Sequence, residues 1–223
     1  MNVGVVVFPG SNCEHDVVEA VSAAGGQAQL RWHGDHSLGD VDAVVLPGGF
    51  AHGDYLRPGA IARFSPLMGA VGEFAQAGGP VLGICNGFQV LTEAGLLPGA
   101  LQKNTGLKFL CRTVEVRVDS TRSVLTSRAS PGQVLHLPIN HFEGNYTCSE
   151  RTLAELRADD RIVLRYADNP NGATDDIAGI CSAEGNVVGL MPHPERASDP
   201  LLGSTDGLVL LRSFLSAPAT TAR

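Results

Sequence analysis

The strongest chemical signal in the sequence is a cysteine between small residues, in the segment Gly83-Ile84-Cys85-Asn86-Gly87. The segment lies between an apolar run typical of a buried strand and a pattern typical of a helix. A nucleophile on a tight strand-to-helix turn needs small neighbours, because larger side chains would collide there. The start of a helix also stabilises a thiolate through the helix dipole and the free amides. Taken alone, the segment is equally compatible with a glycine-rich turn that buries an ordinary cysteine.

A histidine and a carboxylate stand two residues apart in the segment Pro192-His193-Pro194-Glu195, directly after another apolar run. A residue before a proline favours an extended conformation, and side chains two apart in an extended chain face the same side. His193 and Glu195 are therefore expected to lie together, with the carboxylate fixing the imidazole tautomer and the imidazole facing the thiol of Cys85. Such a nucleophilic triad is defined by geometry, not by order along the chain. The alternative is a proline-braced loop with solvated charges.

A pair of glycines follows a third apolar run, in Leu46-Pro47-Gly48-Gly49-Phe50. Glycines let backbone amides approach a ligand, which suits an oxyanion hole, although a Gly-Gly pair after a strand more often marks only a turn. The segments around Cys85 and His193 also follow predicted strands. Open α/β sheets place their active sites at the carboxyl ends of strands, so the sequence predicts that the three segments meet at one edge of a sheet.

The elements that must position these segments alternate between strand and helix patterns in the first half of the chain. The predicted strands there are Val3–Phe8, Ala28–Trp32, Ala43–Leu46 and Pro80–Ile84, and the predicted helices are Glu14–Ala24, Ala60–Ala77 and Gly87–Ala94. After Gly99 the predicted elements are the strands Cys111–Val118, Val134–Leu137, Ile177–Ser182 and Val187–Met191 and the helices Arg151–Leu156 and Asp206–Leu215. Alternation with continuous apolar strands predicts a parallel sheet covered on both faces.

We therefore expect a single α/β domain over residues 1–216, built on one open, twisted, mostly parallel or mixed sheet with helices on both faces. Residues 217–223 are expected to form a loose tail.

Composition narrows the classes of function. The 223 residues carry a formal net charge of −7, and no cluster of Lys and Arg predicts binding to nucleic acid or to an anionic membrane. No apolar stretch approaches the roughly 18 residues that span a bilayer, and the first residues lack the pattern of a secretory signal. Five scattered cysteines without a Cys-x-x-Cys pair argue against a disulfide framework and a zinc site, so the sequence predicts a cytoplasmic protein without a bound metal.

The three segments, in this order and spacing, resemble those of the class I (triad-type) glutamine amidotransferases, a family with a flavodoxin-like fold. The resemblance extends over essentially the full length of the chain. Longer strings resemble the subfamily of glutaminase subunits of phosphoribosylformylglycinamidine synthase. These strings are Phe8–Cys13, Pro47–Phe50, Gly53–Arg57, Cys85–Gln89, Met191–Arg196 and Leu202–Gly207.

The resemblance implies a role for each matching residue. Cys85 would attack the side-chain amide of glutamine, His193 would act as general base and then as general acid, and Glu195 would orient the imidazole. The remaining implied roles are an oxyanion hole made by the backbone amides of Gly49 and Asn86, and contacts to glutamine from Gly48 and Gln89.

The resemblance also implies a larger synthetase subunit, often joined by a third small subunit. The larger subunit would bind ATP, magnesium and formylglycinamide ribonucleotide, and it would receive the ammonia. This chain itself has no phosphate-binding Gly-x-x-x-x-Gly-Lys loop and no length for a synthetase domain, so no cofactor is expected in it. The residues predicted to face the partner are Asn12, Asp54, Arg57 and His141.

One position departs from the subfamily pattern. Phe142 stands where related sequences usually have the first glycine of His-Gly-Glu-Gly, which leaves the conformation of that loop open. Among the other reactive residues, Cys13 and His15 are expected to be structural or partner-facing. Cys111, Cys148 and Cys181 are expected to be ordinary core or strand thiols.

Two other classes of function remain open at this point. One is a different cysteine enzyme on a related fold, such as a stand-alone hydrolase or a DJ-1-like protein. The other is a degenerate subunit that stimulates a partner without chemistry of its own. The segment His193-Pro194-Glu195 argues against the first, and the joint presence of Cys85, His193 and Glu195 argues against the second.

Overall fold

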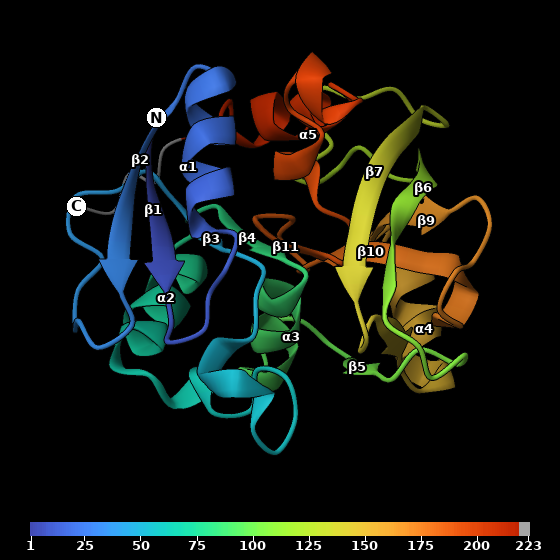
Figure 1. Cartoon of the computed structure of the whole chain (residues 1–223), viewed down its shortest axis with the longest axis horizontal. Coiled ribbons are helices and arrows are strands. Elements are labelled where there is room, and N and C mark those ends of the chain that lie inside the picture. The colour runs from blue at the N-terminus through green and yellow to red at the C-terminus, as the bar shows by residue number, and fades with distance from the viewer. Residues whose placement is uncertain (219–223) are drawn as a thin grey trace.

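A nine-stranded mixed sheet organises the chain in the computed structural model, which describes residues 1–218 (Figure 1). The strand order across this sheet is β2-β1-β3-β4-β11-β10-β9-β6-β7. Neighbouring strands are parallel from β2 to β11 and antiparallel from β11 to β7. The predicted open, mixed α/β sheet is confirmed.

The parallel part of the sheet holds the three segments that carry the candidate chemistry. Its strands are β1 (Asn2–Val7), β2 (Gln27–Trp32), β3 (Ala43–Leu46), β4 (Val81–Ile84) and β11 (Val187–Leu190). Every residue of β3, β4 and β11 is buried, as expected for parallel strands covered on both faces. Because these strands run in one direction, the residues that follow β3, β4 and β11 emerge at the same edge.

The antiparallel part consists of β10 (Ile177–Cys181), β9 (Ile162–Tyr166), β6 (Leu110–Val118) and β7 (Val134–His141). A separate two-stranded antiparallel sheet pairs β5 (Ala100–Gln102) with β8 (Asn145–Thr147). Short 3-10 turns lie at Ala51–Asp54, Ala62–Phe64, Thr174–Asp176, Pro194–Arg196 and Pro200–Leu202.

Helices cover both faces of the large sheet. The helix α1 (Glu14–Ala23) contacts α5 (Gly207–Phe214), and both contact the turn Pro194–Arg196. Figure 1 shows α1 and α5 together in its upper part, with α2 (Pro66–Gln76) and α3 (Asn86–Glu93) in its lower half. The helix α4 (Glu150–Ala158) is capped by Ser149, whose side chain accepts a hydrogen bond from the amide of Thr152.

The structure corrects the predicted helix Ala60–Ala77. A 3-10 turn at Ala62–Phe64 ends at Ser65, and α2 begins at Pro66. The residue before a proline is pushed out of the helical region, and Ser65 has φ −62° and ψ 140°. The proline therefore divides one predicted helix into two elements.

The second half of the chain holds more strand than the sequence predicted. The strand β7 runs past Pro138 to His141, because β7 is an edge strand, where a residue without an amide hydrogen is tolerated. The short strands β5, β8 and β9 were not predicted. Of these, β9 is central to the sheet, between β10 and β6.

Among the described residues, none of the helices has both the length and the apolar character needed to cross a bilayer. Most of the predicted loose tail, residues 219–223, lies outside the part of the chain that the structure describes.

Candidate active site

Cys85 occupies a strained turn between β4 and α3. Its backbone has φ 51° and ψ −104°, a conformation that side-chain-bearing residues rarely adopt. A Cβ on Gly87 would lie 1.9 Å from the carbonyl oxygen of Leu46, and a Cβ on Gly83 would lie 2.5 Å from Leu91 Cδ1. The predicted need for small neighbours is therefore confirmed. Cys85 is 5 % exposed, and its thiol donates a hydrogen bond of 3.7 Å to the carbonyl of Asn140.

His193 and Glu195 form a buried pair at the same edge of the sheet. The Nδ1 atom of His193 lies 2.6 Å from Oε1 of Glu195, and the two residues are 1 % and 2 % exposed. The prediction that they lie together is confirmed, but the predicted extended backbone is wrong. Pro194–Arg196 forms a 3-10 turn with Pro194 in its first position. The imidazole Nε2 and the carboxylate Oε2 are buried without a hydrogen-bond partner among the described residues.

The protonation of His193 is set by opposing effects. Burial of the ring disfavours its charged form, but the carboxylate of Glu195, followed by Cys85 and Cys13, holds the pKa of His193 well above its ordinary value. Cys85 follows β4 and His193 follows β11, and these strands pair in parallel with Ile84 opposite Leu190, so thiol, imidazole and carboxylate gather at one edge of the sheet. Since Nδ1 is engaged by Glu195, Nε2 is the free nitrogen for proton transfer.

Two backbone amides near Cys85 have no partner of their own. Within residues 1–218, neither Gly49 nor Asn86 donates its amide hydrogen to another protein group. Asn86 is the first residue of α3, so its amide is one of the free donors at a helix start. Gly49 has φ 142°, and a Cβ there would lie 2.6 Å from the amide nitrogen of Asn12. Free amides beside a nucleophile suit an oxyanion hole.

Gly48 packs directly against the candidate base. A Cβ at this position would lie 2.7 Å from Cε1 of His193 and 3.1 Å from Sγ of Cys13. Its carbonyl accepts hydrogen bonds of 3.2 Å from the amides of Asn12 and Cys13. Gly48 therefore sets how closely the loop after β3 approaches the imidazole.

A buried amide network fixes the loops around Cys85. The side chain of Asn86 accepts from the amide of Ala51 at 3.0 Å and donates to Asp54 at 3.1 Å and to Gln89 at 2.8 Å. Gln89 in turn donates to the carbonyl of Glu143 at 2.6 Å. The sequence indicated Asn86 only for its backbone amide, whereas its side chain joins the loop after β3 to α3.

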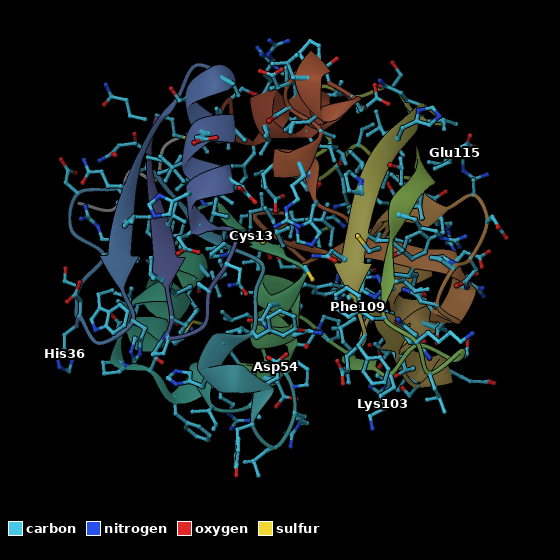
Figure 2. All side chains as sticks on the ribbon, viewed as in Figure 1. Cys13, His36, Asp54, Lys103, Phe109 and Glu115 are labelled. Atoms are coloured by element: carbon cyan, nitrogen blue, oxygen red, sulfur yellow. The ribbon has the colours of Figure 1, made fainter. Side chains whose placement is uncertain are left out.

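Two acidic groups meet in this network. Burial, followed by the charge of Glu143, raises the pKa of Asp54 to about 6, against the effect of its hydrogen bond from Asn86. Burial also raises the pKa of Glu143, while Lys103 opposes that shift. Figure 2 shows Asp54 and Lys103 in the lower part of the molecule.

The residues predicted to face a partner have different surroundings. Asn12 and Arg57 are exposed, and Arg57 forms a two-point ion pair with Glu93 at 2.6 and 2.7 Å. His141 is only 3 % exposed, so its side chain offers no surface to a partner and that prediction is wrong. Burial, followed by the charge of His193, lowers the pKa of His141 to about 4, which keeps its ring neutral near pH 7.

Phe142 fits its loop without backbone strain. It is not among the residues of the described chain with positive φ, so a side chain costs nothing that a glycine would avoid. Its carbonyl accepts a hydrogen bond from the amide of Asn104 at 2.8 Å, and Lys103 Nζ lies 5.9 Å from the centre of its ring. Gly144, two residues further on, must be small, since a Cβ there would lie 2.1 Å from the ring of His141.

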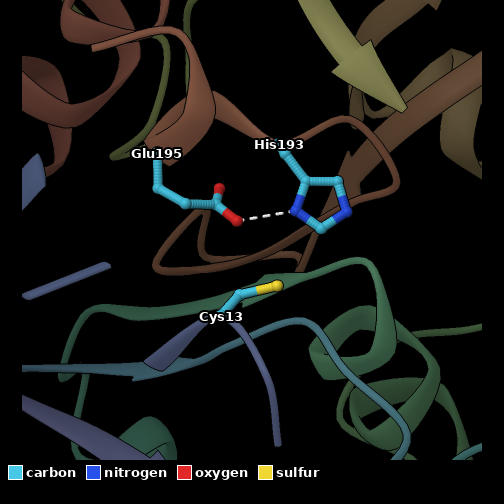
Figure 3. A group of neighbouring side chains, drawn as sticks. All are labelled: Cys13, His193 and Glu195. Atoms are coloured by element: carbon cyan, nitrogen blue, oxygen red, sulfur yellow. Dashed lines mark hydrogen bonds and ion pairs between the residues drawn. The ribbon is translucent and has the colours of Figure 1, made fainter. Parts of the chain in front are cut away.

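Cys13 is a site neighbour that the sequence did not identify. It is 2 % exposed, and its sulfur lies with His193 and Glu195 in a group whose donor atoms are all within 4.8 Å of one another (Figure 3). Arg196 Nη2 lies 3.2 Å from this sulfur, and its Nε lies 3.0 Å from Asp16. Of the two roles expected for Cys13, structural or partner-facing, its burial fits the structural one. Local spacing could not reveal these contacts, because about 180 residues separate Cys13 from the others.

The arrangement fits nucleophilic acyl transfer. A thiol on a strained turn, a buried imidazole held by a carboxylate and two free amides are the groups that a nucleophile, a base and an oxyanion hole require. This combination disfavours a degenerate subunit, since the groups are assembled and not merely present in the sequence.

Comparison with known proteins agrees with the geometry. Residues 1–205 match the family described as CobB/CobQ-like glutamine amidotransferase domain. A protein of Rubrobacter xylanophilus named phosphoribosylformylglycinamidine synthase subunit PurQ is 61 % identical over 97 % of this chain and 98 % of its own length. A protein of Koribacter versatilis with the same name is 53 % identical over 98 % of this chain and 99 % of its own.

Solved structures give the same fold. A chain in the structure of PurLQS from Thermotoga maritima superposes with a TM-score of 0.90 at 39 % identity, covering 96 % of this chain and 97 % of that chain. A glutamine amidotransferase of Thermotoga maritima superposes with a TM-score of 0.61 at 18 % identity, covering 96 % of each chain. The second likeness is one of fold alone.

Proposed function

The chain belongs to the CobB/CobQ-like glutamine amidotransferase domain family, and we propose that it is the glutaminase subunit of a phosphoribosylformylglycinamidine synthase. It hydrolyses glutamine to glutamate and delivers the ammonia to a synthetase subunit. That subunit uses ATP to convert formylglycinamide ribonucleotide to formylglycinamidine ribonucleotide, in the cytoplasmic de novo synthesis of purines. The observation that carries the proposal is the buried His193–Glu195 pair at the end of β11, next to the end of β4 where Cys85 occupies its strained turn.

The first half of the reaction forms a thioester. Cys85 Sγ attacks the side-chain carbonyl carbon of glutamine, and His193 Nε2 takes the thiol proton. The negative charge that develops on the carbonyl oxygen is stabilised by the amides of Gly49 and Asn86. The carbon–nitrogen bond then breaks, and His193 returns the proton to the departing nitrogen, which leaves as ammonia.

The second half restores the enzyme. A water molecule gives a proton to His193 and attacks the thioester carbon. The carbon–sulfur bond breaks, glutamate leaves, and Cys85 recovers its proton. Glu195 has the same task in both halves: it holds Nδ1 of His193, fixes the tautomer and stabilises the imidazolium. Gln89 and Gly48 border the site and are proposed to contact the bound glutamine.

The proposed partner surface surrounds the loop that carries Asp54. Tyr55 and Leu56 are 74 % and 83 % exposed, and Phe50 is 49 % exposed. Exposed apolar side chains next to a binding site are typical of a docking surface. Asn12 and Arg57 are proposed to lie on the same surface. ATP and magnesium are proposed to bind on the synthetase subunit and not on this chain.

The proposal is tested by comparing glutamine with ammonium chloride as the source of nitrogen. In the assembled complex, Cys85→Ala should abolish amidine formation from glutamine and leave amidine formation from ammonium chloride intact. The matched control is Cys181→Ala, a buried thiol in β10, which should support both reactions. Equal use of glutamine by the Cys85→Ala complex would refute the assignment of the nucleophile. Failure of the unmodified complex to form any amidine would refute the proposed function.

A further inference from the structure

Cys13, His193 and Glu195 present three different metal-binding groups to one small space. The residues are 2 %, 1 % and 2 % exposed, and one donor atom from each lies within 4.8 Å of the others. Figure 3 shows the Cys13 sulfur pointing toward the space between the carboxylate of Glu195 and the ring of His193. Cys13 precedes α1, whereas the other two residues follow β11, so the fold assembles the group.

The donor set suits one kind of ion. Thiolate, imidazole and carboxylate are the ligands of Zn²⁺, and three of them leave a fourth position for water. At ordinary bond lengths of about 2.0 Å to nitrogen and oxygen and about 2.3 Å to sulfur, tetrahedral donors stand roughly 3.3 to 3.6 Å apart. The observed group is within reach of that spacing through side-chain movement. A buried oxygen, Glu195 Oε2, has no hydrogen-bond partner among the described residues and is free to bind.

The side chain of Arg196 disfavours a bound cation in its present position, but it can move away. Arg196 Nη2 lies 3.2 Å from the Cys13 sulfur, and its positive charge would repel a metal ion. Its side chain is 32 % exposed and already bound to Asp16, so it can turn toward solvent. A cleft of about 370 Å³ adjoins Glu195 and Arg196, and its walls also include Asp16, Glu19, Ser198 and Asp199. Its four carboxylates favour the approach of a cation.

We propose that Cys13, His193 and Glu195 form an inhibitory zinc site behind the triad. Zinc would replace the hydrogen bond between Glu195 and Nδ1 of His193, and it would bind thiolate in place of the Cys13 thiol. The imidazole could then no longer take a proton from Cys85 in the correct position. The inhibition rests on the proposed function, in which His193 is the base, whereas the binding of zinc does not.

Binding is tested on the full chain, without reference to activity. Zn²⁺ affinity is measured by competition with a chromophoric chelator, and Co²⁺ is used as a spectroscopic substitute whose charge-transfer absorption reports a bound thiolate. The unmodified chain and Cys85→Ala should each bind one ion and show this absorption. Cys13→Ser should bind at least tenfold more weakly and lose it. Cys111→Ser removes an exposed thiol and is the matched control, expected to behave as the unmodified chain.

The opposite pattern would overturn the proposal. If Cys85→Ala abolishes binding and Cys13→Ser does not, the ion binds the catalytic thiol instead. Absence of a stoichiometric site in the unmodified chain would also overturn it. Thermal unfolding checks that Cys13→Ser is folded, and the Cys85→Ala comparison shows whether the catalytic thiol is the ligand even if it is not.

Inhibition is then measured as the ratio of glutamine turnover with and without Zn²⁺ for the unmodified chain, Cys13→Ser and Cys111→Ser, with recovery after addition of a chelator. The unmodified chain should be inhibited reversibly, and Cys13→Ser should need at least tenfold more Zn²⁺. Stoichiometric binding through Cys13 without any effect on turnover would overturn the inhibitory role. A chain that binds zinc through Cys13 but never hydrolyses glutamine would refute the proposed function and leave the metal site standing.

Discussion

Replacement of Gly48 by alanine should damage catalysis without damaging the fold. The added Cβ would lie 2.7 Å from Cε1 of His193, whereas ordinary contact begins at about 3.4 Å. The imidazole must therefore retreat by about 0.7 Å, although Glu195 holds its Nδ1 atom at 2.6 Å. A misplacement of about 1 Å in an active site can cost on the order of 100-fold in rate. We expect kcat for glutamine hydrolysis to fall between about 10-fold and 100-fold, or about 1.4 to 2.7 kcal/mol of activation free energy.

The assay compares three variants that each add one methyl group. Gly69→Ala and Gly72→Ala lie in α2, where an added Cβ meets nothing within 4 Å. These controls should keep full activity and gain up to about 1 kcal/mol of unfolding free energy, because alanine is the better helix former. Ammonia release gives kcat and KM, and denaturant titration gives stability. A Gly48→Ala protein with unchanged kcat would refute the inferred contact between Gly48 and the base.

Three further predictions follow from the site. His193→Ala should reduce glutamine hydrolysis to near background while Glu195→Gln keeps a measurable fraction, since an imidazole without its carboxylate still accepts a proton part of the time. In Glu195→Gln the carboxylate no longer opposes the effect of burial, so the pKa of His193 should fall. The part of the pH profile of kcat/KM that reports His193 should then move to lower pH. Equal, mild losses in both variants, or an unmoved pH profile, would point to a structural loop. Because burial raises the pKa of Asp54 from 3.8 to about 6, the folded protein should lose stability as pH rises between these values, and the Asp54→Asn variant should lack this loss. Denaturant titrations at pH 4 and pH 7 measure the difference, and an identical pH dependence of the two proteins would contradict it. The isolated chain should hydrolyse glutamine more slowly than the complex with its nucleotide ligands, because docking on the loop beside Gly49 favours the arrangement in which the amide points at the oxyanion; an isolated chain that reaches the rate of the complex would contradict this switch.

Residues whose role depends on their immediate neighbours were predictable from the sequence. The strained turn at Cys85 needs Gly83 and Gly87, and both glycines lie two residues from Cys85 in the sequence. His193 and Glu195 were correctly paired although the reason was incomplete. The prolines were expected to extend the chain, but Pro194 begins a 3-10 turn that also brings the two side chains together.

Contacts that depend on the whole fold were not predictable from local spacing. Cys13 reaches His193 and Arg196 only because the ends of β1 and β11 open at the same edge of the sheet. His141 was expected to face a partner because its loop lies at the same end of the sheet as the other candidate loops, yet the segment around Gly144 closes over its ring. The strand β9 was missed as well, since its short apolar run is not distinctive without knowledge of the strands on either side.

The central claim is that Cys85, and not the neighbouring Cys13, is the nucleophile. A glutamine analogue with an electrophilic ketone in place of the amide traps the attacking sulfur as a stable adduct, which peptide mass spectrometry then locates. We expect one adduct per chain, on Cys85, with labelling slowed by glutamine and abolished in Cys85→Ala. Glutamine-protected labelling of Cys13, or of Cys85 and Cys13 alike, would contradict the account.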